Sequence, residues 1–189
     1  SSINGDVPSS LKTVIISNDS SVTSIGYQAF YNCSGLTSIT IPDGVTSIGN
    51  SAFRGCSGLT SVIIGNGVTS IGKYAFLDCS RLESITLPFV GAELNGTENT
   101  HFGYIFGAGS SSENSNYVPS NLKTVIISND SSVTSIGLYA FENCSGLTNI
   151  IISDSVTTIG SSAFEGCSSL ENITLPFIGA ELNGTEDTP

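Results

Sequence analysis

Residues 36–58 of the chain read LTSITIPDGVTSIGNSAFRGCSG, and residues 59–81, which follow directly, read LTSVIIGNGVTSIGKYAFLDCSR. Each stretch is 23 residues long, and the second is nearly a copy of the first. In the first stretch Leu36, Ile39 and Ile41 have strand spacing, with the last two side chains on one face. The copy keeps this pattern, so the same strand is expected twice.

The rest of the 23-residue unit predicts two further pieces. The V-T-S-I segment predicts a second short extended piece, and Ala52, Phe53 and Cys56 have the spacing of one helical turn. Gly49 lies between these pieces and recurs in other copies. A glycine kept at one corner indicates a positive φ or a close approach of another backbone.

Seven units begin with the same leucine, and a single unit is too short to bury its own apolar side chains. Stacking neighbouring units supplies the missing burial, so the chain is predicted to be a repeat solenoid. We expect one domain over residues 1–189. The unit starts, numbered here as coils 1 to 7, are Leu11, Leu36, Leu59, Leu82, Leu122, Leu147 and Leu170.

The pattern C-S-x-L-x-x-I-x-I-P-x-x-V-x-x-I-G-x-x-A-F-x-x-C, almost complete between Cys33 and Cys56, resembles the BspA-like leucine-rich repeats. The resemblance implies an α/β repeat solenoid dominated by strands: a right-handed coil with a parallel strand ladder and short helical turns. It also implies a cell-surface or secreted protein that adheres to other cells or to matrix proteins such as fibronectin and fibrinogen. It supplies no binding residue.

Coil 4 departs from the repeat between residues 89 and 121, a segment called here the insertion. Its His101, Phe102 and Tyr104 allow two interpretations. The HFGYIF segment either replaces the missing S-A-F-x-x-C turn and fills the core, or presents aromatic side chains to a ligand. Residues 110–116 are expected to form an exposed loop. Both ends of the sequence repeat parts of this segment, so a fragment of a longer protein is expected.

The formal charge is −11, with only five lysines and arginines among 189 residues. Nucleic acids and anionic membranes are recognised through clustered cations, so neither partner is expected. No apolar run approaches the length of about 18 residues that a membrane span requires, and no membrane insertion is expected within this segment. The polar, weakly charged composition favours an extracellular protein.

The sequence offers no recognisable chemistry. All five cysteines share one position of the repeat, which predicts a column of buried free thiols rather than a disulfide framework. A single histidine, His101, cannot supply a catalytic triad or a multi-histidine metal site. The two SNDSS segments at 17–21 and 128–132 carry one aspartate each and are read as turns. No enzyme activity, cofactor or metal is expected.

The remaining candidate site is the outward side of the predicted ladder. The residue between the two core positions of each strand faces outward, and four of the seven are isoleucines. β-Branched residues suit any strand surface, but solenoids also bind partners along such extended faces. The predicted contact row is Ile15, Thr40, Ile63, Thr86, Ile126, Ile151 and Thr174.

Three functions remain open at this stage. The first is a non-catalytic adhesion module that recognises a host or neighbouring-cell surface protein, including a matrix protein, through many weak contacts. The second is a structural stalk that projects other domains. The third is a glycan-binding module that uses the aromatic side chains of the insertion.

Overall fold

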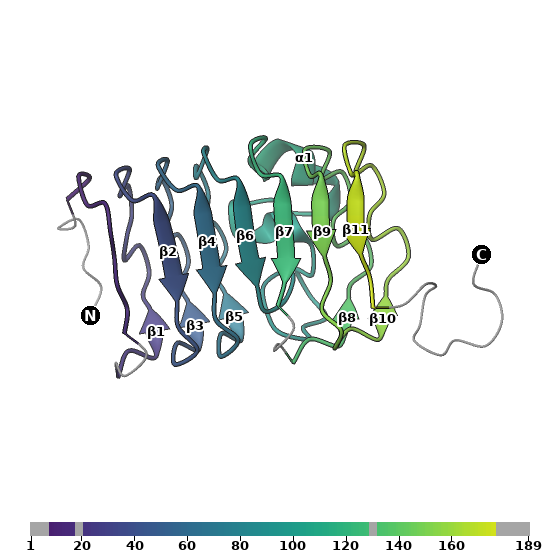
Figure 1. The fold of residues 1–189 in the computed structure, drawn as a ribbon, viewed down its shortest axis with the longest axis horizontal. Coiled ribbons are helices and arrows are strands. Elements are labelled where there is room, and N and C mark those ends of the chain that lie inside the picture. The colour runs from purple at the N-terminus through teal and green to yellow at the C-terminus, as the bar shows by residue number, and fades with distance from the viewer. Residues whose placement is uncertain (1–7, 18–20, 129–131, 177–189) are drawn as a thin grey trace.

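The computed structural model describes residues 8–17, 21–128 and 132–176 of the chain. The successive coils lie side by side in one elongated body, with their longest strands in a single layer (Figure 1). Most of the two SNDSS segments lies outside the described residues. The parallel-strand solenoid predicted from the repeat is therefore confirmed.

The main sheet has six parallel strands in the order β11-β9-β7-β6-β4-β2. Corresponding residues of successive coils pair, as Thr40 does with Ile63 and Ile63 with Thr86. In β2 and β4 the alternation of exposed and buried residues matches the predicted period of two. The strands are β2 (Ser38–Ile41), β4 (Ser61–Ile64), β6 (Ser84–Leu87), β7 (Thr124–Ile127), β9 (Asn149–Ile151) and β11 (Asn172–Thr174).

The V-T-S-I segments form shorter parallel strands along one edge of the solenoid. They make two separate sheets, β1-β3-β5 and β10-β8, so this second ladder is interrupted where the main one is continuous. Gly49 accommodates a close neighbour, because a Cβ there would lie 2.8 Å from the backbone nitrogen of Tyr27. The strands are β1 (Ser24–Ile25), β3 (Ser47–Ile48), β5 (Ser70–Ile71), β8 (Ser135–Ile136) and β10 (Thr158–Ile159).

The core is a column of identical side chains from successive coils. Phe30, Phe53 and Phe76 stack with ring centroids 5.1 and 5.3 Å apart and planes within 8° of parallel. The cysteines form a neighbouring column, in which the Cys56 thiol donates to the Phe30 carbonyl oxygen and the Cys79 thiol to that of Phe53. Burial of leucine, isoleucine and phenylalanine from adjacent coils is what stabilises the stack.

The predicted helical turns in the A-F-x-x-C segments are wrong. In the described regular coils these segments are successive tight turns, and the described helices all lie in the insertion. Two residues per coil have a left-handed backbone, as Ser51 (φ 57°) and Gly55 (φ 76°) do in coil 2. A left-handed residue ends a right-handed helix, so two of them four residues apart leave no room for one.

The insertion fills the place of the missing turn of coil 4. It contains the 3₁₀ helices η1 (Phe102–Phe106) and η2 (Ser111–Glu113) and the single-turn helix α1 (Asn114–Tyr117). The Phe76 amide donates to the Ile105 carbonyl oxygen at 2.9 Å, and the Phe102 amide donates to that of Ala140 at 2.7 Å. The insertion therefore hydrogen-bonds to coil 3 on one side and to coil 5 on the other, as a regular turn would.

Candidate functional site

The outward row of the main sheet contains six of the seven predicted contact residues, and this row together with Ile15 of coil 1 is called here the ladder face. Pairing places them in one register, from Thr40 across Ile63, Thr86 and Ile126 to Ile151 and Thr174. Ile15 precedes the row in coil 1, where a single bridge joins Thr13 to Ser38. Neighbouring strands lie about 4.8 Å apart, so the row repeats at that interval.

Three isoleucines of the ladder face are markedly exposed. Relative exposure is 86% for Ile15, 45% for Ile63 and 38% for Ile151. Ile126 and Thr86 are half-buried, whereas Thr40 and Thr174 are exposed. Burying such side chains is favourable, so contact with an apolar partner surface here would stabilise a complex.

Two shallow hollows lie next to each other on this face and share Thr40. One has a volume of about 240 Å³ and is lined by Ile63 and Thr86 together with Asp43 and Asn66 of the following turns. The other, of about 270 Å³, is lined by the 13–16 segment and residues 38–40. The face is therefore hollowed from coil 1 to coil 4.

The outward strand residues of the ladder face carry no charge, and Asp43 lies at the edge of one hollow. The outward strand residues that flank the contact row are also serine, threonine or asparagine: Thr13, Ser38, Ser61, Ser84, Thr124, Asn149 and Asn172. Within the described ranges the one ion pair joins Arg54 to Asp78, at 3.6 Å between Nε and Oδ2, in the turns. The acidic net charge of the chain is thus borne by other surfaces, and contacts on this face depend on shape, methyl groups and hydroxyls.

The insertion residues named as possible contacts are mostly inaccessible. Phe102 is fully buried and packs against Phe141, with ring centroids 5.2 Å apart. His101 is buried, and its Nε2–H donates to the Ala108 carbonyl oxygen at 3.2 Å. Burial also lowers the pKa of His101. Only Tyr104 is partly exposed, and it packs edge-on against His101. These residues fill the core, as the first interpretation of the insertion states.

The Asn114 side chain of α1 replaces a backbone hydrogen-bond donor that coil 4 lacks. In regular coils the amide before the cysteine donates to the next coil, as Gly55 donates to Leu77. At the junction the Asn114 side-chain amide donates instead to the Glu142 carbonyl oxygen at 2.8 Å. Its Oδ1 accepts from the Gly103 amide at 2.9 Å, so this fully buried side chain is satisfied at both ends. The prediction of an exposed loop over 110–116 is wrong, because η2 and α1 make most of this stretch helical and Asn114 is buried.

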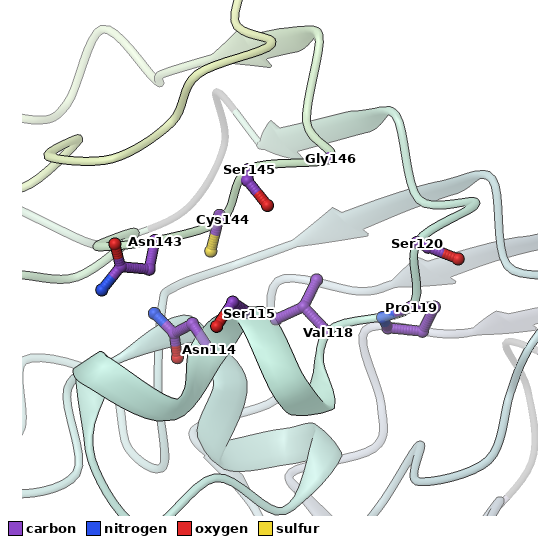
Figure 2. Close-up of a pocket in the computed structure, with 9 residues that line it drawn as sticks. All are labelled: Asn114, Ser115, Val118, Pro119, Ser120, Asn143, Cys144, Ser145 and Gly146. Atoms are coloured by element: carbon purple, nitrogen blue, oxygen red, sulfur yellow. The ribbon is translucent and has the colours of Figure 1, made fainter.

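A small cavity of about 80 Å³ separates α1 from the turn of coil 5. Figure 2 shows Asn114 and Ser115 on one wall and Asn143 and Cys144 on the opposite one. Burial raises the pKa of the Cys144 thiol well above its ordinary value, so this thiol stays protonated at neutral pH. The cavity is too small for more than a few waters.

A larger groove, of about 460 Å³, lies on the other side of the 115–120 segment, against residues 77–80 of coil 3. Tyr117, which sequence reasoning did not single out, lines this groove and is 39% exposed. The N-Y-V-P sequence around Tyr117 contains no signal that distinguishes it from the other exposed tyrosines, which lie in regular turns. Its importance follows only from the fold of the insertion.

The described residues contain no group of three or more His, Cys, Asp or Glu side chains that could hold a metal ion. In the same part of the chain no helix is long and apolar enough to cross a membrane. The cysteines there are all free: four are buried and Cys167 is half-buried. This confirms the predicted column of buried thiols for coils 1, 2, 3 and 5.

The repeat decides the family. The sequence profile of the BspA type leucine rich repeat region matches six copies, over residues 7–103 and 111–182. The chain belongs to the BspA type leucine rich repeat family. The resemblance read from the C-S-x-L pattern is thereby confirmed. No curated protein matches the chain.

Several solved structures are similar to this chain over most of its length. The Treponema pallidum leucine rich repeat protein is 25% identical, with 82% of this chain and 53% of that one covered and a TM-score of 0.40. A leucine rich cell surface protein from Faecalibacterium prausnitzii is 25% identical, with 80% and 47% covered and a TM-score of 0.47. A Bacteroides ovatus leucine-rich repeat protein is 24% identical, with 84% and 59% covered and a TM-score of 0.33. The chain spans about half the length of these proteins.

Proposed function

We propose that this chain is a non-catalytic recognition module of a cell-surface or secreted protein, and that it binds another protein through its ladder face. The observation that carries the proposal is the uncharged row of exposed isoleucines and threonines, repeated in register and hollowed around Thr40. An exposed apolar row with no structural partner is typical of an interaction surface.

The extracellular location is supported by three observations. The chain belongs to the BspA type repeat family, and a similar solved protein from Faecalibacterium prausnitzii is described as a cell surface protein. The surface is also polar and weakly charged, since charged residues make up 11% of the sequence. The partner class that fits is a protein of a host or neighbouring cell, including a matrix protein, with a neutral surface rich in small apolar groups.

The repetition favours many weak contacts over one strong site. Each coil presents one outward residue to the same partner, so several contacts form together once the first has formed. A shallow uncharged face gives modest affinity per coil, because no deep pocket excludes water around a single anchor residue. Binding is therefore expected to depend on several coils together.

The test is a paired substitution of Ile63→Asp and Ile151→Asp, which places charge at two exposed points of the ladder face. We expect adhesion to immobilised fibronectin, fibrinogen and intact epithelial cells to fall about tenfold or more, since each carboxylate would have to be desolvated at the interface. Circular dichroism and thermal unfolding would show that the fold persists. Leu138→Asp, at an exposed turn position, is the matched control.

Unchanged adhesion of the doubly substituted protein would reject the ladder face as the binding site. If the unmodified chain adheres to none of the three, the chain is instead a spacer that projects other domains. Reduced adhesion of the Leu138→Asp control would show that added charge itself, and not the location, explains the loss.

A further inference from the structure

The groove beside α1 exists because the insertion fills the core without continuing every hydrogen bond of the ladder. In regular coils the amide of the residue before the cysteine donates to the next coil, as Asn32 donates to Arg54 and Gly55 to Leu77. Asp78 occupies this position in coil 3. Among the described residues the Asp78 amide has no hydrogen-bond acceptor, because coil 4 lacks the turn that would supply one.

Asp78 also provides an exposed carboxylate at the same place. Its backbone is left-handed, with φ 63°, and its side chain is held near Arg54 at 3.6 Å. Asp78 lines the groove, so its unpaired amide and its carboxylate, which it shares with Arg54, are both near a ligand bound there. Two neighbouring hydroxyl groups of a ligand could accept from the amide and donate to the carboxylate.

The opposite wall supplies an aromatic ring. Tyr117 lines the groove and packs close to Gly107, where a Cβ would be 3.2 Å from the Tyr117 ring and 2.8 Å from the Tyr74 ring. Gly107 has φ 117°, a conformation in which a side chain would also be strained. Both rings therefore pack close to Gly107, and Tyr117, which is 39% exposed, contributes an amphipathic side chain to the groove lining.

The rest of the groove is neutral. Leu77, Cys79, Val118 and Pro119 provide its apolar part, and serine and asparagine side chains provide the rest. The groove has a volume of about 460 Å³ and is open to solvent, so a ligand there would keep one side in water. An aromatic face, an apolar floor, hydroxyls and one carboxylate together match a ring that is apolar on its C–H face and hydroxylated at its edge.

We propose that this groove is a binding site for a neutral saccharide, with one pyranose ring packed on Tyr117 and hydrogen-bonded to Asp78. The site is separate from the ladder face and does not depend on the function proposed for it. An anionic sugar would be repelled by Asp78 and by the acidic net charge of the chain. The groove is shallow, so millimolar affinity for a single sugar is expected.

The experiment is saturation-transfer NMR of the full chain with glucose, galactose, mannose and N-acetylglucosamine, each at about 10 mM, and with glucuronate as the anionic comparison. At least one neutral sugar is expected to give a signal, and glucuronate a weaker one. Tyr117→Ala and Asp78→Gly should each weaken the affinity for that sugar about tenfold. Asp78→Gly removes the side chain and its exposed ion pair with Arg54 but keeps the backbone amide, and glycine occurs at the equivalent Gly55 and Gly166, so folding is retained.

Tyr31→Ala is the matched control, because Tyr31 is an exposed tyrosine on a regular turn with the same 39% exposure. It should bind the sugar with unchanged affinity, as should the Ile63→Asp, Ile151→Asp protein. The proposal is overturned if no neutral sugar gives a signal, if the signal survives both groove substitutions, or if Tyr31→Ala weakens binding equally.

Discussion

Coils 2 and 3 and the junction between coils 3 and 5 fill the same core in two different ways. In the regular coils Phe53 and Phe76 stack almost parallel, at 3°. At the junction Phe76 meets Phe106 at 52°, and Phe106 meets Phe102 at 70°. Each regular coil contributes one phenylalanine ring to the column in the core, whereas the insertion places two rings, Phe102 and Phe106, at the level of coil 4.

The main sheet and the edge formed by the short strands differ in how they pass the insertion. β6 and β7 pair in register through four residues, although 36 residues of sequence separate Leu87 from Thr124. Along the edge formed by the short strands the pairing is interrupted, and residues 92–94 run beside β5 in the antiparallel direction. The continuous main sheet thus keeps the spacing of the coils constant, whereas the pairing of the short strands changes at the insertion.

The largest expected effect compares the two kinds of core directly. Phe53→Ala and Phe102→Ala should each lower the free energy of unfolding by about 3–5 kcal/mol, because both rings are fully buried. Denaturant unfolding measures the two losses, with Tyr31→Ala, expected to cost about 0.5 kcal/mol or less, as the exposed control. A much smaller loss for Phe102→Ala would mean that the junction is less well packed than the coils.

A second comparison concerns the hydrogen bonds that replace the ladder. Asn114→Ala leaves the Gly103 amide and the Glu142 carbonyl without partners and should cost about 2–3 kcal/mol. Asn116→Ala, two residues away and exposed, is the control and should have little effect. If the two variants unfold at the same denaturant concentration, Asn114 does not replace the missing backbone bond.

The third comparison uses the thiols as reporters. Cys79 lies in a regular coil and Cys144 at the junction, and both are buried, whereas Cys167 is half-buried. Burial raises the pKa of Cys56 to about 12 and displaces those of Cys79 and Cys144 in the same direction. Burial also raises the pKa of Cys167, but this thiol is only half-buried, so a disulfide reagent at pH 8 should label it about tenfold faster than Cys56, Cys79 and Cys144.

Peptide mass mapping after brief labelling would locate each modified cysteine. Equal labelling of Cys79 and Cys144 would show that the junction is as closed as a regular coil. Labelling of Cys144 as fast as that of Cys167 would show that the insertion opens in solution, and would move the weakest point of the core from the end of the array to its middle.

The regular coils could be predicted from sequence because one pattern is repeated with the same spacing. Leu36, Ile39 and Phe53 are buried as expected, and the strand register follows from the period of the repeat. The turns were predicted as helical because Ala52, Phe53 and Cys56 have helical spacing. The left-handed residues that prevent a helix include serine and tyrosine, which carry no such signal in sequence.

The insertion could be predicted only in its aromatic part. The HFGYIF segment has apolar side chains at the spacing of a turn, which makes a core role one of two interpretations, and the burial of Phe102 and Phe106 decides for it. Asn114 and Tyr117 lie in a stretch of serine and asparagine that resembles any polar loop. Their roles depend on which groups coil 5 and coil 3 leave without partners, and this information is not local to the segment.

The in-register pairing of β6 with β7 has a consequence for how such chains diversify. Because the two strands meet as though they were consecutive, the exposed part of the peptide between them can lengthen, shorten or change composition while its buried residues, such as Phe102 and Asn114, keep the core filled. Selection could therefore exchange the loop, and with it any ligand preference, without redesigning the scaffold on either side.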